Sequence, residues 1–373
     1  MTINKIFNNV YENKKVLITG HTGFKGSWLT LWLTEMGADV TGYSLDPPTK
    51  PGLFSCLELD KKIEHIIGDI RDAEKIKKIL KKYKPEMVFH LAAQSLVRAS
   101  YKEPKLTYET NVMGTVNLFE AVRNTESVRV VVNVTSDKCY ENKEWIYGYK
   151  ETDTLGGYDP YSSSKACAEL VTSCYRNSFF YPPNYNKTHN VALASVRAGN
   201  VIGGGDWAQD RLIPDCIKAL NDGQTIYIRN PLAIRAWQYV LEPLSGYLWL
   251  GNLLFEKGNI YSEGWNFGPS DNDILTVDDV VKKVLKLWEN GRYEITHDTK
   301  MHETELLKLD ISKARFILDW NPIYTVNTAI EETINWYKEF YYGDKKKIFE
   351  FTLNQIEKYI KAAKEAVVKW SIE

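Results

Sequence analysis

Short apolar segments alternate with helical segments through the first half of the chain, and this alternation constrains the possible fold more than any other feature. The apolar segments have the length of strands and are rich in Val and Ile. Alternation at this pitch predicts an α/β fold with a doubly wound parallel sheet, whose ligands lie at the carboxyl ends of the strands. We expect strands at 16–19, 40–43, 66–68, 87–91, 130–134 and 191–196, and helices at about 24–36, 71–83, 103–124 and 160–180.

The charge of the chain is nearly balanced. With 47 Lys and Arg against 48 Asp and Glu, the formal net charge is -1, which gives no general attraction to nucleic acid or to an anionic membrane. The five cysteines form no Cys-x-x-Cys pair, the six histidines are scattered, and there is no signal core and no apolar run of bilayer length. We therefore expect a reduced, cytoplasmic protein without a metal, whose partner is a small molecule.

A glycine-rich turn follows the first predicted strand. The run "GHTGFKG" places Gly20, Gly23 and Gly26 between a strand and a helix. Such glycines permit a tight turn and a close approach of a pyrophosphate to backbone amides at the start of the helix, although a glycine turn can also be simple punctuation. We predict a dinucleotide site here, with contacts from Gly20, Thr22, Gly23, Phe24, Lys25 and Gly26.

The choice between NAD and NADP is less clear in the sequence. An acidic residue at the end of the second strand favours NAD, but Asp46 comes a few residues late, after Ser44, and Lys25 could attract a 2'-phosphate. Asp69 is suited to an adenine contact, or equally to capping a helix. We expect NAD, with further contacts from Ser44, Asp69, Ile70, Leu91, Ala92, Ala93 and Asn111.

Asn111 is included because Asn is a poor residue for the middle of a helix, which suggests a specific hydrogen bond, although a solvent-facing Asn is the alternative.

Tyr161 and Lys165 open the helix that follows Pro160. A four-residue step places both side chains on one helix face, where they can share a ligand. A nearby ammonium and a positively charged nicotinamide ring both favour a phenolate, so we expect the pKa of Tyr161 to fall and the phenol to act as a base. Both residues should also contact the cofactor.

The run "NVTSDKCY" ends an apolar strand with three polar residues. Ser136, Asp137 and Lys138 are costly at this position unless they face a ligand. The alternative is that Asp137 and Lys138 form an exposed ion pair.

These motifs, with "GGYDPYSSSK", "RAGNVIGGGDW", "RLIPD" and "WNFGP", resemble the extended short-chain dehydrogenase/reductase family over nearly the whole chain, and within it the 4,6-dehydratases that act on CDP-glucose. The resemblance implies a Rossmann-like sheet and an NAD-dependent reaction in which C4 of the hexose is oxidised, water leaves across C5 and C6, and the hydride returns to C6. The implied product is CDP-4-keto-6-deoxyglucose, a precursor of the deoxysugars of lipopolysaccharide or capsule.

The resemblance also implies roles for the polar run. Related dTDP-glucose enzymes have Thr-Asp-Glu where this chain has Ser136-Asp137-Lys138. Ser136 would then hydrogen-bond the C4 hydroxyl, Asp137 would be the general acid, and Lys138 the base that removes the C5 proton. The assignment with Asp137 as the base and Lys138 as the acid stays open.

Substrate contacts are also implied. Arg suits a diphosphate because it makes bidentate contacts, and the resemblance implies that the substrate binds Gln94, Ser136, Asn200, Arg211 and Arg235. The chain departs from the family pattern at Ala236 and Tyr239, which puts the base or sugar preference in doubt.

Two closely joined domains are expected. The NAD-binding domain would span 1–198 with a return segment near 236–260, and a smaller mixed α/β substrate domain would span 199–235 and 261–373. Helices are expected near 239–256, 276–289 and 326–340. The tail has one apolar seam, which docks on its own chain or on a neighbouring subunit, and consists of Phe349, Leu353, Ile356, Ile360, Ala363 and Val367.

Three functions remain open. The favoured one is the dehydratase described above, working as a homodimer or homotetramer that pairs through the helices at 103–124 and 160–180. A nucleotide-sugar 4-epimerase, or a 4,6-dehydratase for another nucleotide sugar, would share most of the site. A dinucleotide-binding scaffold without catalysis would have no use for Ser136, Asp137, Lys138, Tyr161 and Lys165 together.

Overall fold

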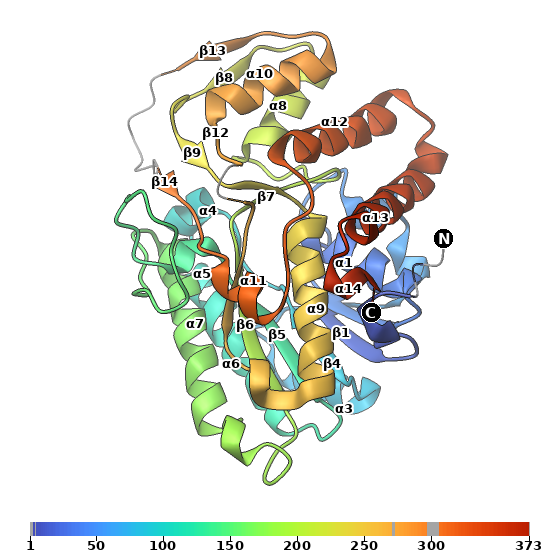
Figure 1. Cartoon of the computed structure of the whole chain (residues 1–373), viewed down its shortest axis with the longest axis vertical. Helices are drawn as coiled ribbons and strands as arrows, with labels where there is room; N and C mark the ends of the chain where they lie inside the picture. Colours follow the sequence, from blue (N-terminus) through green and yellow to red (C-terminus); the bar gives the residue numbers. More distant parts are fainter. Residues whose placement is uncertain (1–2, 4, 271–272, 297–305, 373) are drawn as a thin grey trace.

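A seven-stranded parallel sheet forms the centre of the computed structural model, which describes residues 3, 5–270, 273–296 and 306–372 (Figure 1). The strand order is β11-β6-β5-β4-β1-β2-β3. The predicted doubly wound parallel sheet is confirmed. Its strands are β1 (Lys15–Thr19), β2 (Asp39–Ser44), β3 (Glu64–Ile67), β4 (Met87–His90), β5 (Val130–Val134), β6 (Ala192–Ala198) and β11 (Gly264–Phe267).

Both faces of this sheet are covered by helices. Val16 and Ile18 of β1 pack into one apolar cluster, while Leu17 between them packs into the other. Successive side chains of a strand point to opposite faces, so a strand buried on both faces is apolar throughout. On the first face lie α1 (Phe24–Glu35) and α9 (Leu241–Lys257), and on the second α3 (Ala73–Tyr83), α6 (Gly114–Arg123) and α7 (Pro160–Ser178).

The strand order reverses at β1. From β1 the chain runs outward through β2 to β3, and β4 then returns to the other side of β1. A crevice for a ligand forms at such a switch point, beyond the carboxyl ends of the strands. The glycine-rich turn and the ends of β4 and β5 meet there.

Smaller elements gather at one end of the molecule, at the top of Figure 1, around α8 (Leu212–Asn221) and α10 (Val277–Trp288). Thr276 caps α10 in a capping box with Asp279. Short strands accompany these helices: β7 (Asn200–Ile202), β8 (Ile226–Ile228), β9 (Ile234–Arg235), β10 (Trp237–Tyr239), β12 (Leu275–Thr276), β13 (Tyr293–Ile295) and β14 (Leu306–Leu307).

The second half of the chain returns to the main sheet more extensively than the expected segment near 236–260. The edge strand β11 pairs with β6 from Gly264↔Ser195 to Phe267↔Ala198, so the return reaches Phe267. The division of the chain into two domains stays a proposal. In this division the end of the return segment moves from about 260 to the end of β11.

The helix expected at 103–124 is interrupted. Its parts are α5 (Pro104–Tyr108), a π-helical turn at Glu109–Met113, and α6. A π turn inserts an extra residue and turns the side chains that follow it, and such turns are frequent at functional sites. Asn111 lies within this turn and is buried.

The apolar tail docks on its own chain, which was one of the two alternatives. In α13 (Ile348–Glu365), Ile356, Ile360 and Ala363 are buried as expected, while Phe349 and Leu353 are half-buried. The prediction for Val367 was wrong: this residue lies beyond the end of α13 with φ 56° and is 68% exposed.

The last helix completes this docking. In α14 (Lys369–Ile372), the ring of Trp370 stacks on Phe7 at 4.9 Å and lies 6.1 Å from Trp32 of α1, and both chain ends lie on the same side of the molecule (Figure 1). No helix in the described part of the chain is long and apolar enough to cross a membrane.

The remaining helices connect these layers: α2 (Leu53–Cys56), α4 (Val97–Lys102), α11 (Ser312–Ile317) and α12 (Val326–Tyr342).

Candidate active site

A cavity of about 1960 Å³ lies at the carboxyl ends of β1, β4 and β5. Among its lining residues are all of the predicted catalytic residues, all of the predicted substrate contacts and every predicted cofactor contact except Asn111. The topology therefore brings residues from positions 20 to 235 into one site. Their contacts with a ligand stay predictions.

The glycine-rich turn fits the close approach of a ligand. Gly20 has φ +76°, and a Cβ there would lie 2.7 Å from the backbone N of Ala92, while a Cβ on Gly26 would lie 2.1 Å from the carbonyl O of Gly20. No other residue satisfies both positions without a shift of the backbone. Gly23 is the N-cap of α1 and supplies no side-chain cap, so the first amides of α1 keep donors for a phosphate.

The ends of β2 and β3 form the next part of the wall. Thr22 is fixed there because its Oγ1 lies 2.8 Å from Ser44 Oγ and donates to the carbonyl O of Leu45 at 2.9 Å. Asp69 pairs with Arg71 at 2.6 Å, which lowers the pKa of this carboxyl through the hydrogen bond from Arg71. Asp69 does not cap α3, because the N-cap is Asp72.

Asn111 lies behind the cavity wall, so its predicted cofactor contact is not supported by its position. It is 2% exposed, its Oδ1 accepts from the backbone N of Gln94, and its Nδ2 donates to Gln94 O and Ser164 Oγ. The specific hydrogen bond inferred from the sequence is present, and it joins the end of β4 to α7. Asn111 therefore helps to hold the cavity wall at Gln94 in place.

Gln94 lines the cavity, but its amide is already engaged with its own loop and with α5. Nε2 donates to Leu96 O and Thr107 Oγ1, while Oε1 accepts from Leu96 N at 2.6 Å. A substrate contact by this side chain requires one of these bonds to open.

The polar run after β5 forms a short 3-10 turn over Asp137–Cys139. Ser136 Oγ accepts from Lys138 N at 3.2 Å and donates to Asp137 Oδ1 at 3.0 Å. Asp137 is 7% exposed, and a Cβ on Gly199 would lie 3.2 Å from its Oδ2, so backbone closes over the carboxyl group. Burial raises its pKa. The alternative of an exposed ion pair with Lys138 is therefore wrong.

Tyr161 and Lys165 lie on one face of α7 and both are buried, as expected from their spacing. Lys165 Nζ donates to Val134 O at 3.3 Å. The expected fall in the pKa of Tyr161 is not found: burial raises it to about 12, and a hydrogen bond with Ser136 opposes that rise. Burial lowers the pKa of Lys165 to about 8.

Lys25 points toward the reacting end of the cavity. Burial, together with the positive charges of Lys165 and Arg211, lowers its pKa to about 7. Its Nζ lies 5.8 Å from the centre of the Tyr247 ring. Because the ammonium lies near Lys165, Arg211 and the Tyr247 ring, the suggestion that Lys25 meets a ribose 2'-phosphate is not supported.

Arg211, Arg235 and Asn200 also line the cavity. Arg211 pairs with Asp206 at 2.7 Å, and its charge opposes the rise in the pKa of Tyr161, which places it near the phenol. Tyr239, by contrast, lies in the core between Trp28 and Tyr324.

Ala236 and Tyr239 both lie outside the cavity lining. Their departure from the family pattern is therefore no evidence about which nucleotide base the substrate carries.

Sequence reasoning missed a buried ion pair below the polar run. Glu169 of α7 and Arg197 of β6 are 3% and 4% exposed, and Arg197 Nη2 donates to Glu169 Oε2 at 2.7 Å. The available signal was a charged residue inside the apolar strand "ALASVRA", which requires a buried partner.

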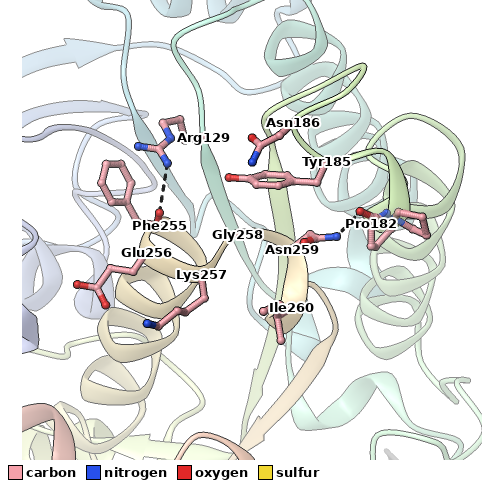
Figure 2. Close-up of a pocket in the computed structure, with 11 residues that line it drawn as sticks. Arg129, Pro182, Tyr185, Asn186, Phe255, Glu256, Lys257, Gly258, Asn259 and Ile260 are labelled. Atoms are coloured by element: carbon pink, nitrogen blue, oxygen red, sulfur yellow. Dashed lines mark hydrogen bonds between the residues drawn. The ribbon is translucent and has the colours of Figure 1, made fainter.

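A smaller cavity of about 500 Å³ lies elsewhere, between the end of α9 and the loop near Pro182 (Figure 2). Arg129 donates to Phe255 O, and Asn259 donates to Pro182 O, so these polar groups already have hydrogen-bond partners within the cavity wall. It contains no predicted site residue. Among the described residues, no group of three or more His, Cys, Asp or Glu side chains could hold a metal ion.

A doubly wound parallel sheet with a glycine-rich turn after β1 and a buried Tyr/Lys pair on α7 defines the class of the protein, an extended short-chain dehydrogenase/reductase. The family model described as GDP-mannose 4,6 dehydratase matches residues 17–333. This chain belongs to that family.

Relatives support the same family. The CDP-glucose 4,6-dehydratase of Salmonella typhimurium is 54% identical over 340 residues, covering 91% of this chain and 94% of the relative. The dTDP-glucose 4,6-dehydratase of the same organism is 27% identical and covers 87% of this chain and 92% of the relative.

Solved structures share the fold. A dTDP-glucose 4,6-dehydratase from Streptomyces venezuelae with NAD and TYD bound has a TM-score of 0.74 at 24% identity, covering 87% of this chain and 97% of that chain. An epimerase from Methanothermobacter thermautotrophicus has a TM-score of 0.76 at 24% identity, covering 91% and 96%.

Proposed function

We propose that the protein is an NAD-dependent nucleotide-sugar 4,6-dehydratase that converts CDP-glucose to CDP-4-keto-6-deoxyglucose. The observation that carries this proposal is the convergence of Ser136, Asp137 and Lys138 with Tyr161 in one cavity. Removing a C5 proton and protonating the C6 oxygen needs two titratable groups beyond the Tyr/Lys pair, and this site offers them. The 54% identity to a CDP-glucose 4,6-dehydratase supports the choice of CDP-glucose.

The turn at Gly20, Gly23 and Gly26 would hold the pyrophosphate of the cofactor. Bound NAD would supply the redox chemistry, taking up the hydride from C4 and giving it back at C6. The other predicted contacts lie along the same wall from β2 to β4, and the NAD-bound dehydratase from Streptomyces venezuelae supports NAD as the cofactor.

Tyr161 would remove the proton of the C4 hydroxyl, with Ser136 as its hydrogen-bond partner. Because burial raises the pKa of Tyr161 to about 12, the phenol keeps its proton until positive charge approaches the ring. Lys165 would orient the cofactor from one turn along the helix.

Asp137 would be the general acid. Burial raises the pKa of its carboxyl, which favours the protonated form that an acid must start from. This direction supports Asp137 as the acid and Lys138 as the base over the swapped assignment. Lys138 follows Asp137 in the same turn and lines the same cavity.

Arg211, Arg235 and Asn200 would bind the nucleotide diphosphate, because all three line the cavity and Arg makes bidentate contacts with phosphate groups. Arg211 already pairs with Asp206, which holds its guanidinium in place.

A homodimer or homotetramer is part of the proposal. Large apolar side chains are exposed on and near α4 to α7, on the face where subunits were expected to pair: Tyr101, Tyr108, Met113, Leu170, Phe179 and Tyr181. All five cysteines are free thiols, which supports the proposed cytoplasmic location.

Product mass tests the proposal. The purified protein is incubated with CDP-, dTDP-, UDP- and GDP-glucose, each with NAD or NADP. We expect loss of one water from CDP-glucose with NAD. A product of unchanged mass would identify a 4-epimerase instead, and the absence of turnover with all four sugars would overturn the proposal.

A further inference from the structure

The buried pair Glu169–Arg197 lies next to the polar run Ser136–Lys138, which is called the catalytic run below. Glu169 is one turn beyond Lys165 on α7, and Arg197 is on the neighbouring strand β6. Ser195 Oγ adds a second hydrogen bond to Glu169 Oε2 at 2.7 Å. A buried ion pair needs further hydrogen bonds of this kind, because desolvation of two charges otherwise exceeds their attraction.

Each member of the pair holds one end of the catalytic run. Thr135 Oγ1 donates to Glu169 Oε1 at 2.5 Å, just before Ser136. Arg197 Nη1 donates to the phenol O of Tyr140 at 2.6 Å, two residues after Lys138. The run Ser136–Lys138 is thus a short span between two anchors on one rigid unit.

The second anchor extends into the rest of the chain. Tyr140 OH donates to Asn266 Oδ1 at 2.8 Å, and Asn266 Nδ2 donates to the carbonyl O of Tyr149 and of Asp310. The rings of Tyr140 and Tyr149 stack at 5.2 Å. These bonds connect the catalytic run to β11 and to the loop before α11.

We propose that Glu169 and Arg197 are positioning residues that clamp Thr135 and Tyr140, and so hold Ser136, Asp137 and Lys138 in register with Tyr161. The inference rests on the proposed function. An apolar pair of similar volume could fill the same space at little cost in stability. An apolar pair could not hydrogen-bond the hydroxyls of Thr135 and Tyr140, and this need for hydrogen bonds explains why two charged residues lie here.

The same carboxylate also acts on Lys165. Burial lowers the pKa of Lys165, and the charge of Glu169 opposes that fall. The titratable groups around Lys165 are Glu169, Cys139, His90 and Lys25. Arg197 and Arg176 face Glu169. Removing the charge of Glu169 therefore shifts loss of the Lys165 ammonium to lower pH.

The test compares Glu169→Gln with wild-type protein and with Glu332→Gln. Glu332 is a matched control because it is 4% exposed and paired with Lys358, on α12 away from the cavity. For Glu169→Gln we expect kcat to fall about 10²-fold with little change in KM, because small displacements of catalytic groups cost that much. The alkaline limb of the kcat profile should shift to lower pH. Amide hydrogen exchange at 135–140 should become faster. Glu332→Gln should change none of the three.

Two outcomes overturn the inference: exchange at 135–140 that matches the control, or a kcat and pH profile that match the wild type. If Glu169→Gln does not fold, Thr135→Val and Tyr140→Phe each remove one anchor, and a kcat unchanged in both would overturn the inference as well. Inactive wild-type protein would instead overturn the proposed function, and hydrogen exchange would still decide whether the clamp exists.

Discussion

Tyr161 and Lys165 lie one turn apart on α7, and burial moves their pKa values in opposite directions, to about 12 for the phenol and about 8 for the ammonium. In both cases burial favours the uncharged form. At neutral pH the phenol is therefore uncharged and the ammonium is still mostly charged, so the phenol is the group that needs a bound ligand to lose its proton.

Replacing Tyr161 by Phe should abolish turnover with little effect on stability. The phenol oxygen is the proposed base, and losing a general base costs about 10²–10⁴-fold. The matched control is Tyr175→Phe on the same helix, which removes a hydroxyl that bonds Glu120 outside the cavity. Product formation by mass spectrometry and thermal unfolding of both variants check this. Substantial dehydration by Tyr161→Phe would remove the phenol from the mechanism.

The variant Lys138→Met should separate oxidation from elimination. Without the proposed base the C5 proton stays in place, so water loss should stop while some 4-keto hexose still forms. Mass spectrometry of the nucleotide sugar distinguishes loss of hydrogen from loss of water. Dehydration at the wild-type rate would show that Lys138 takes no part.

Asp137→Asn should lower the dehydration rate and raise the thermal stability. The pKa of Asp137 is higher in the folded chain than its ordinary value. As pH rises from the ordinary pKa through the raised one, the buried carboxyl loses its proton and destabilises the fold. The amide avoids this cost, and we expect the Tm at pH 8 to rise on the order of 2 °C. Dehydration should fall about 10²-fold, as for loss of a general acid. A Tm that drops at pH 8 would contradict the assigned direction of the pKa.

A second buried carboxyl makes the C-terminal docking depend on pH. Glu242 accepts from the backbone N of Ile323 and of Tyr324 and from Tyr359 OH, and burial raises its pKa to about 7. Because the folded chain holds this proton more tightly than the unfolded chain, its contribution to stability falls as pH rises from about 4.5 through 7. The expected change is roughly 3 kcal/mol.

Thermal unfolding from pH 5 to 8 measures this effect. The loss of Tm with pH should be smaller in Glu242→Gln than in the wild type or in the exposed control Glu289→Gln. Identical slopes in all three proteins would refute the role of Glu242.

The fold could be predicted from local pattern because the central strands β1, β4 and β5 are buried on both faces and therefore almost entirely apolar. The pairing of Tyr161 with Lys165 could be predicted because both lie on one helix, where spacing fixes the geometry. The glycine-rich turn was similarly local.

The remaining features depend on contacts between distant parts of the chain. Glu169 and Arg197 are 28 residues apart in sequence, and the packing of α7 against β6 brings them together. The direction of Lys25 and the burial of Tyr239 depend on α9 and α12, whose packing no local pattern describes. The rise in the pKa of Tyr161 reflects burial by the whole cavity wall.

The most direct test of the account follows the atoms of one substrate. The wild-type protein is given CDP-glucose that carries deuterium at C4 and ¹⁸O at C6, and the product is analysed by mass spectrometry and NMR. The account predicts that deuterium appears in the C6 methyl group and that the ¹⁸O leaves as water. A product that keeps its ¹⁸O, or a methyl group without deuterium, would contradict it.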